Sequence, residues 1–134
     1  MPKQSSATGC KPKPALKNRV LLCGDALIDL ELTFKMLANG TRLRLLHALV
    51  REGELCVGEL GAALDMTSQA VSNQLQRLAH RGIVEARRDG LQIYYCVVDS
   101  CVVALIERAW CLTEEGHARV SHGFRSAGQE RQAG

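Results

Sequence analysis

The fold is decided by two neighbouring stretches in the middle of the chain, ELCVGEL at residues 54–60 and TSQAVSNQL at residues 67–75. The first stretch places one thiol, Cys56, at the head of a short apolar helix. The second begins a helix that reaches about His80 and carries apolar residues on one side and polar residues on the other. Only residues 65–67 connect them, so the pair predicts a helix-turn-helix.

A β-hairpin is predicted directly after these helices. Beyond Gly82 the apolar period changes from helical to two, in residues 83–87 and again in residues 91–97. Asp89-Gly90 lies between the two runs, and Asp-Gly is a strong turn signal because glycine adopts positive φ without strain. A helix-turn-helix followed by a hairpin is the order of elements in a winged helix-turn-helix.

Three further helices complete the expected fold. Apolar residues recur at helical spacing from about Val20 to Leu37, and again from about Cys101 to Glu115. Between them, Asn39 is a candidate N-cap for an apolar helix that Gly53 ends. The prediction is a mainly α fold of about five helices with a small two-stranded wing. Its expected parts are a flexible basic arm (1–18), a DNA-binding and dimerisation domain (19–119) and a flexible tail (120–134).

Charge and composition support a DNA-binding protein. The net charge is only +3, but five basic residues and no acidic residue occupy the first 19 positions. A second basic cluster, from Arg77 to Arg88, includes one acidic residue, Glu85. Local clusters of this kind suit phosphate. No apolar run approaches the roughly 20 residues of a membrane span, and no signal peptide is recognisable, so we expect a cytoplasmic protein without membrane contact.

The second helix of the helix-turn-helix carries the predicted DNA-reading face. Such a helix enters the major groove, where Asn and Gln can pair with adenine while Ser and Thr mostly contact phosphates. The two arginines before the turn of the hairpin would lie at its tip and touch the backbone or the minor groove. The predicted DNA-binding residues are Thr67, Ser68, Gln69, Ser72, Asn73, Gln76, Arg77, Arg87 and Arg88.

The chain resembles the ArsR/SmtB family of metal-responsive repressors in three motifs. These are LANGTRLRLL at residues 37–46, ELCVGEL at residues 54–60 and QAVSNQL at residues 69–75. The resemblance implies a homodimer that binds a palindromic operator when metal-free and releases it when a metal or metalloid binds. The family usually has Asp-Pro where this chain has Asn39-Gly40, and many members have His at the position of Asn73.

Two sensor sites are implied by the resemblance. The first joins Cys56 to a thiol near the N-terminus, either Cys10 or Cys23 or both. The second lies on the last helix, where Asp99 and Glu115 match the family pattern. There Cys101 replaces one His, Leu112 replaces the other, and Cys111 lies one position away. Replacing imidazoles by thiols shifts the expected inducer from Zn(II) towards Cd(II), Pb(II), Hg(II) or As(III).

Other functions remain open to different degrees. The thiols could respond to oxidants or polysulfides by forming a disulfide, which would make a redox-responsive repressor of the same fold. The cysteines could also be structural, since free Cys is often a small buried hydrophobe. The spacing gives no CxxC pair or zinc finger. An enzyme is not expected, because a nucleophilic cysteine needs a base beside it and no such Cys/His signature is recognisable.

Overall fold

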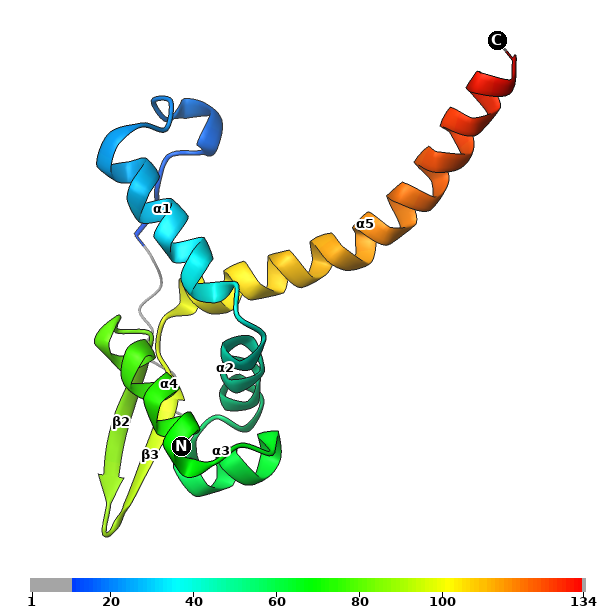
Figure 1. The fold of residues 1–134 in the computed structure, drawn as a ribbon. Coiled ribbons are helices and arrows are strands. Elements are labelled where there is room, and N and C mark those ends of the chain that lie inside the picture. Colours follow the sequence, from blue (N-terminus) through cyan, green and yellow to red (C-terminus); the bar gives the residue numbers. More distant parts are fainter. Residues whose placement is uncertain (1–10, 134) are drawn as a thin grey trace. The chain divides into compact units, whose positions relative to one another are not determined.

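The computed structural model describes residues 11–133, with side chains up to residue 117 and at residue 119. Residues up to Ser100 and residues from Cys101 onward form two units, and each is described by itself. The elements, in order along the chain (Figure 1), are η1 (Leu16–Asn18), α1 (Gly24–Leu37), α2 (Gly40–Glu52), β1 (Leu55–Cys56), α3 (Val57–Leu64), α4 (Ser68–His80), β2 (Val84–Asp89), β3 (Gln92–Val97) and α5 (Ser100–Ala133). The winged helix-turn-helix prediction is confirmed.

Helix α2 begins and ends where the local signals predicted. The Asn39 side chain accepts a hydrogen bond of 2.9 Å from the backbone N–H of Arg42, which satisfies one of the unpaired donors of the first turn. Gly53 follows the last helical residue with φ of +87°, a conformation that glycine adopts without strain. The helix supplies Leu45, Leu46 and Leu49 to the core, all three without exposed surface.

A close backbone approach forms the turn between α3 and α4. The N–H of Met66 donates to the carbonyl of Gly61 at 2.9 Å, after Asp65 has ended α3 in the left-handed conformation with φ of 55°. A Cβ atom added to Gly61 would lie 2.8 Å from the carbonyl oxygen of Met66. Only glycine fits at this position without a shift of the turn. Thr67 then caps α4 by accepting from the N–H of Ala70.

The core of the first unit lies between these helices and the sheet. Helix α3 packs against both α2 and α4, and α2 and α4 also contact β3 and β2, respectively. Besides the three leucines of α2, the fully buried side chains in the described part of the chain are those of Val84, Leu60, Val71, Leu75 and Leu78. Because α4 gives the last three of these, its position is fixed by the core.

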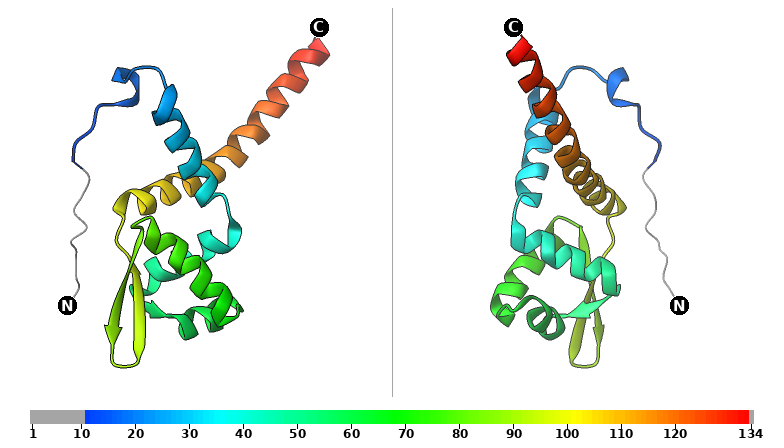
Figure 2. Two further views of the ribbon diagram at one scale, coloured as in Figure 1. Left: turned by 60° about the vertical axis from the view of Figure 1, so that its left-hand side comes forward. Right: turned by 90° about the vertical axis from the view of Figure 1, so that its right-hand side faces the viewer.

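The sheet has three antiparallel strands in the order β1-β3-β2. Asp89 pairs with Gln92, so Gly90 and Leu91 form a two-residue turn, with φ of +65° at Gly90. In both views of Figure 2 the hairpin of β2 and β3 extends as a narrow ribbon beyond the helices. This ribbon is the wing.

Three features of the fold differ from the sequence-based expectation. Strand β1 was not predicted, because two residues are too few to show an alternating pattern. Helix α1 begins at Gly24 instead of Val20, since φ of +59° at Gly24 prevents a right-handed helix from extending further back. Helix α5 continues to Ala133 instead of ending near Glu115, through a segment without proline in which three Ala, three Arg and two Gln favour a helix and three Gly do not.

The predicted boundaries at residues 18/19 and 119/120 stay predictions. Residues 1–10 of the expected basic arm lie outside the described residues. Within the described range, no helix is both long enough and apolar enough to cross a membrane.

Candidate DNA-reading surface and thiol sites

The predicted reading residues of α4 lie together on one side of the helix. The side chains of Val71, Leu75 and Leu78 point into the core and are fully buried. The predicted reading residues are polar and exposed or half-buried, namely Thr67 at the cap, then Ser68, Gln69, Ser72, Asn73, Gln76 and Arg77. This contrast gives α4 the form that the major groove requires, with one side anchored and the other able to donate and accept hydrogen bonds.

Two of these side chains contact each other one turn apart. The amide of Gln69 donates to Oδ1 of Asn73 at 3.0 Å on the exposed surface. An amide whose oxygen is already paired keeps its N–H₂ group for another acceptor. The pair therefore holds Asn73 in one orientation while leaving donors available. No DNA contact is established by this arrangement, and the roles of these residues stay predictions.

Arg87 of the wing is bound within the protein. Its Nη2 and Nε atoms donate to the two carboxylate oxygens of Glu54, at 2.7 Å and 2.9 Å. The guanidinium also lies 5.1 Å from the ring centre of Tyr94 and 3.8 Å from the carboxylate of Asp89. The hydrogen bonds to Glu54 raise the pKa of Arg87 above its usual value. The charge of Arg87, one of the three arginines predicted to contact DNA, is thus opposed by a carboxylate.

The two wing arginines lie within β2 and not at the tip. Arg87 pairs with Tyr94 and Arg88 pairs with Ile93, whereas the tip consists of Gly90 and Leu91. The strand extends through Asp89 because the turn needs only two residues, which moves both arginines away from the end of the hairpin. Among the described residues, no hydrogen bond or ion pair engages the Arg88 side chain, which is exposed.

Cys56 occupies the junction between the sheet and α3. It is the last residue of β1, where it pairs with Tyr94, and it is also the N-cap of α3. Only 8% of it is exposed. Its backbone N–H donates to Oε1 of Glu59 at 3.0 Å. This bond, and a further one from the Cys56 side chain, lower the pKa of Glu59. The Glu at the third helical position was a readable capping signal that the sequence analysis did not use.

The other predicted ligand residues are dispersed. Cys23 is the exposed N-cap of α1, and Cys111 is exposed on α5. Cys101 lies in the first turn of α5 and is disulfide-bonded. Cys10 lies outside the described residues. Cys101 and Cys111 are ten positions apart on one helix, about 15 Å along its axis, so they cannot share an ion within one chain.

Within residues 11–133, no three Cys, His, Asp or Glu side chains are grouped as a metal site. The fit of this chain to a thiophilic ion therefore rests on the kind of donor that it offers. Thiolates at positions 23, 56 and 111 suit soft ions better than Mg(II) or Ca(II), which prefer oxygen. The ligand set itself stays a prediction.

Comparison with known proteins agrees with this geometry. A sequence model described as MarR family matches residues 39–92, from the cap of α2 to the first residue of β3. The cadmium resistance transcriptional regulatory protein CadC of Listeria innocua is 34% identical over 82 residues, which span 61% of this chain and 69% of that protein. The MarR-family match spans the helices and the first wing strand from α2 to β2, whereas the match to CadC is longer, at 82 residues.

Two solved structures are similar along most of their length. The AntR antimony-specific transcriptional repressor is 51% identical with a TM-score of 0.68, covering 81% of this chain and 98% of that one. The homodimeric winged helix-turn-helix domain of Mb0332 from Mycobacterium bovis, a possible ArsR-family regulator, is 34% identical with a TM-score of 0.60 and coverages of 72% and 93%. The chain therefore belongs to the ArsR/SmtB family of metal-responsive winged helix-turn-helix repressors, a family of DNA-binding regulators and not of enzymes.

Proposed function

We propose that this protein is a homodimeric repressor that releases its operator DNA when a thiophilic metal or metalloid ion binds cysteine thiolates that include Cys56. The observation that carries the proposal is the position of Cys56. Its backbone is paired with Tyr94 of the wing on one side and begins α3 on the other. A ligand bound there acts on both parts of the DNA-binding unit at once.

The geometry explains how binding at Cys56 can oppose DNA binding. Helix α3 is joined to α4 through the tight Gly61–Met66 turn, so a displacement of the N-terminus of α3 is passed to the reading helix. An ion that lowers DNA affinity 100-fold needs a coupling free energy of about 3 kcal/mol. Metal–thiolate bonds are strong enough to supply this amount.

The proposed homodimer is supported by a homodimeric relative and by the exposed apolar side chains of helix α1. The Mb0332 domain is homodimeric. In this chain α1 exposes several large apolar side chains, among them Leu27, Ile28 and Phe34, each about half exposed. A row of this kind on one helix is suited to burial against a second copy. Two copies would place two α4 helices on the half-sites of a palindromic operator, about one DNA turn apart.

The inducer is proposed from the names of the relatives together with ligand chemistry. CadC is named for cadmium and AntR for antimony, and both ions favour sulfur ligands. We extend the predicted set of Cd, Pb, Hg, As and Zn by Sb(III) for this chain.

The test measures the fluorescence anisotropy of the reduced protein on its own upstream DNA, with each of these ions titrated separately. Release by thiophilic ions at low stoichiometry supports the proposal. Cys56→Ser is expected to retain operator binding and to raise the ion concentration for half-release at least about tenfold, as expected when a metal site has one ligand fewer. Unchanged release in Cys56→Ser would move the sensor to the cysteines of α5.

The response should weaken as the pH falls. A thiol has an ordinary pKa of about 8.5 and must lose its proton to bind the ion, so acid competes with metal. Titration of Glu59 does not interfere with this pH test. Its pKa is lowered, so its contribution to stability is fully present above its unfolded-state pKa and is lost only as the pH falls through the lowered folded value.

Oxidation is the second candidate trigger, because Cys101 is disulfide-bonded. A parallel titration with a disulfide-forming oxidant distinguishes the two. Release by oxidant alone supports a thiol redox or polysulfide sensor, and tight binding that neither agent disturbs supports a plain repressor with structural cysteines.

A further inference from the structure

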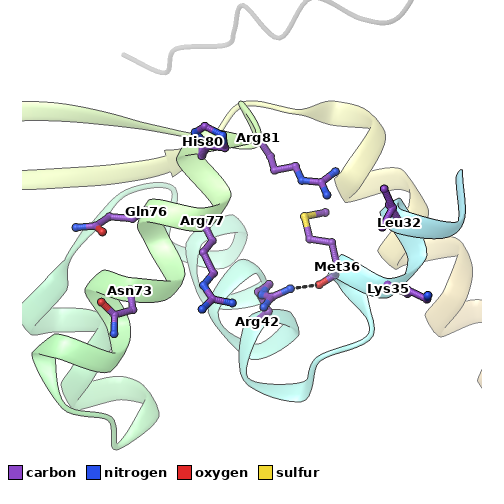
Figure 3. A pocket seen from close by; sticks show the side chains of 9 residues that line it. All are labelled: Leu32, Lys35, Met36, Arg42, Asn73, Gln76, Arg77, His80 and Arg81. Atoms are coloured by element: carbon purple, nitrogen blue, oxygen red, sulfur yellow. Dashed lines mark hydrogen bonds between the residues drawn. The ribbon is translucent and has the colours of Figure 1, made fainter. Parts of the chain in front are cut away.

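A basic hollow lies beside the reading helix. It has a volume of about 820 Å³ and is lined by the C-terminal half of α1, the start of α2 and the C-terminal half of α4 (Figure 3). Five of its lining residues are basic, namely Lys35, Arg42, Arg77, His80 and Arg81, and none is acidic. Such a concentration of one sign of charge in a concave site attracts anions.

Arg42 provides a fixed positive charge in the hollow. Its Nε atom donates to Oε1 of Gln74 at 2.9 Å, and its Nη1 atom donates to the backbone carbonyl of Met36. Both acceptors are neutral. Among the described residues no carboxylate pairs with Arg42, so the guanidinium is held in place while its charge remains available. This is the reverse of Arg87, which is held by a carboxylate.

Two further guanidinium groups come from α4. Arg77 and Arg81 are one helical turn apart, and no ion pair engages either of them within residues 11–133. In Figure 3 the Arg77 side chain extends towards Arg42, and the Arg81 side chain extends towards Met36. Three arginines from two helices thus share one hollow.

The location of the hollow indicates its occupant. Asn73 and Gln76, both predicted base-reading residues, also border it. A helix lying in the major groove, which is about 12 Å wide, has a sugar-phosphate strand along each side. The hollow lies beside the base-reading side of α4, on the side of the helix that faces the start of α2. A DNA strand running along α4 would pass there.

We infer that this hollow is a binding site for a backbone phosphate of the operator, with Arg42 and Arg81 as phosphate contacts in addition to the reading face and the wing. The inference rests on the proposed function, since it needs DNA on α4. Guanidinium groups bind phosphate oxygens through paired N–H donors, which suits three converging arginines. Such contacts orient the protein on DNA and do not read its sequence.

The test compares Arg81→Ala with Arg51→Ala in the full chain. Arg51 is an exposed arginine of α2 that does not line the hollow. Anisotropy titrations on the upstream duplex and on a scrambled duplex are repeated over a range of salt concentrations. Arg81→Ala is expected to weaken binding to both duplexes alike. Its plot of log affinity against log salt should become shallower by about 0.9 for each phosphate that is no longer bound, hence by about 2 for a dimer. Arg51→Ala should match the wild type.

Arg42→Lys is the second variant, because Arg42 also bonds to the protein. Lysine retains the charge but not the guanidinium fork, so affinity for both duplexes should fall while the salt dependence stays close to that of the wild type. Circular dichroism confirms that both variants are folded.

Three results would overturn the inference. If the wild type binds its DNA with a steep salt dependence and Arg81→Ala does the same, the hollow holds no phosphate although the proposed function stands. If inorganic phosphate at matched ionic strength weakens the DNA binding of the wild type and of Arg81→Ala alike, phosphate does not compete at Arg81 and the hollow is not a phosphate site. If the wild type binds no upstream DNA, the proposed function and the inference fail together.

Discussion

The reading helix and the wing both belong to the predicted DNA-binding surface, yet they are held in place differently. Helix α4 contributes three fully buried side chains to the core and is joined to α3 through a turn that only Gly61 permits. In the wing strand β2, only Val84 at its base is buried, and the exposed part is tied to the rest of the protein by the Glu54–Arg87 ion pair. Substitutions in the buried side of α4 or in its turn should therefore lower the stability of the fold. Substitutions in the wing should instead alter DNA binding while the protein stays folded.

The largest effect is expected from Gly61→Ala. The added methyl group would lie 2.8 Å from the Met66 carbonyl oxygen, so the turn has to shift. Overpacking of this kind typically costs about 1–3 kcal/mol of unfolding free energy. Denaturant unfolding measures it, and Gly58→Ala is a matched control on the same helix, where a Cβ meets no atom within 4 Å. Equal stability of the two variants would show that the turn adapts and that α4 is less firmly held than argued.

Asn73→Ala tests the reading side without touching the core. The side chain is exposed and contacts Gln69, so folding should be unaffected. Removal of one base-specific amide contact costs about 1–3 kcal/mol, which is about a 5- to 150-fold decrease in operator affinity. Binding to a scrambled duplex should change little, because phosphates dominate it. An equal decrease on both duplexes would make Asn73 a backbone contact.

The structure shows which features of the reading helix and the wing could be predicted from the sequence. Asn39, Gly53 and Thr67 act through neighbours three or four residues away, and the hairpin turn at Gly90 is equally local. Local signals of this kind are visible in a sequence. The winged helix-turn-helix and its family were therefore predictable.

Long-range partners were not predictable in the same way. Arg87 looked like a DNA contact because the residue that binds it, Glu54, is 33 positions away. Arg42 and Arg81 line the same basic hollow although they are 39 positions apart, because the fold brings the start of α2 close to α4. Strand β1 was not predicted, because its two residues form a strand only by pairing with β3. The predicted thiol sites include Cys10, which lies outside the described residues, and the thiols at positions 23, 56 and 111 are far apart in the sequence, so the composition of these sites stays a prediction.

Arg88→Ala and Arg87→Ala separate the two arginines of the wing. Arg88 has no ion pair among the described residues, so its removal should weaken binding to all duplexes and lower the salt dependence by about 0.9 per contact. Arg87 is opposed by Glu54, so its removal should have the smaller effect on the salt dependence. The same titrations measure both variants. A larger effect at Arg87 would mean that DNA displaces Glu54 from it.

The smallest effect, and the most informative about signalling, is expected from Glu54→Gln. Glu54 lies two residues before Cys56, and through Arg87 it reaches the same wing residue, Tyr94, that pairs with Cys56. An ion bound at Cys56 therefore has a second connection to the wing besides the β1–β3 pairing.

Exposed ion pairs are weak, so operator affinity should change by no more than about threefold. Ion-induced release should become less complete, because a displaced β1 would then move the wing only through its pairing with β3. The matched control is Glu85→Gln, an exposed carboxylate on β2 that makes no ion pair among the described residues. If both variants release DNA as the wild type does, the Glu54–Arg87 ion pair takes no part in the switch, and the signal from Cys56 travels through α3 and the Gly61 turn or through the β1–β3 pairing.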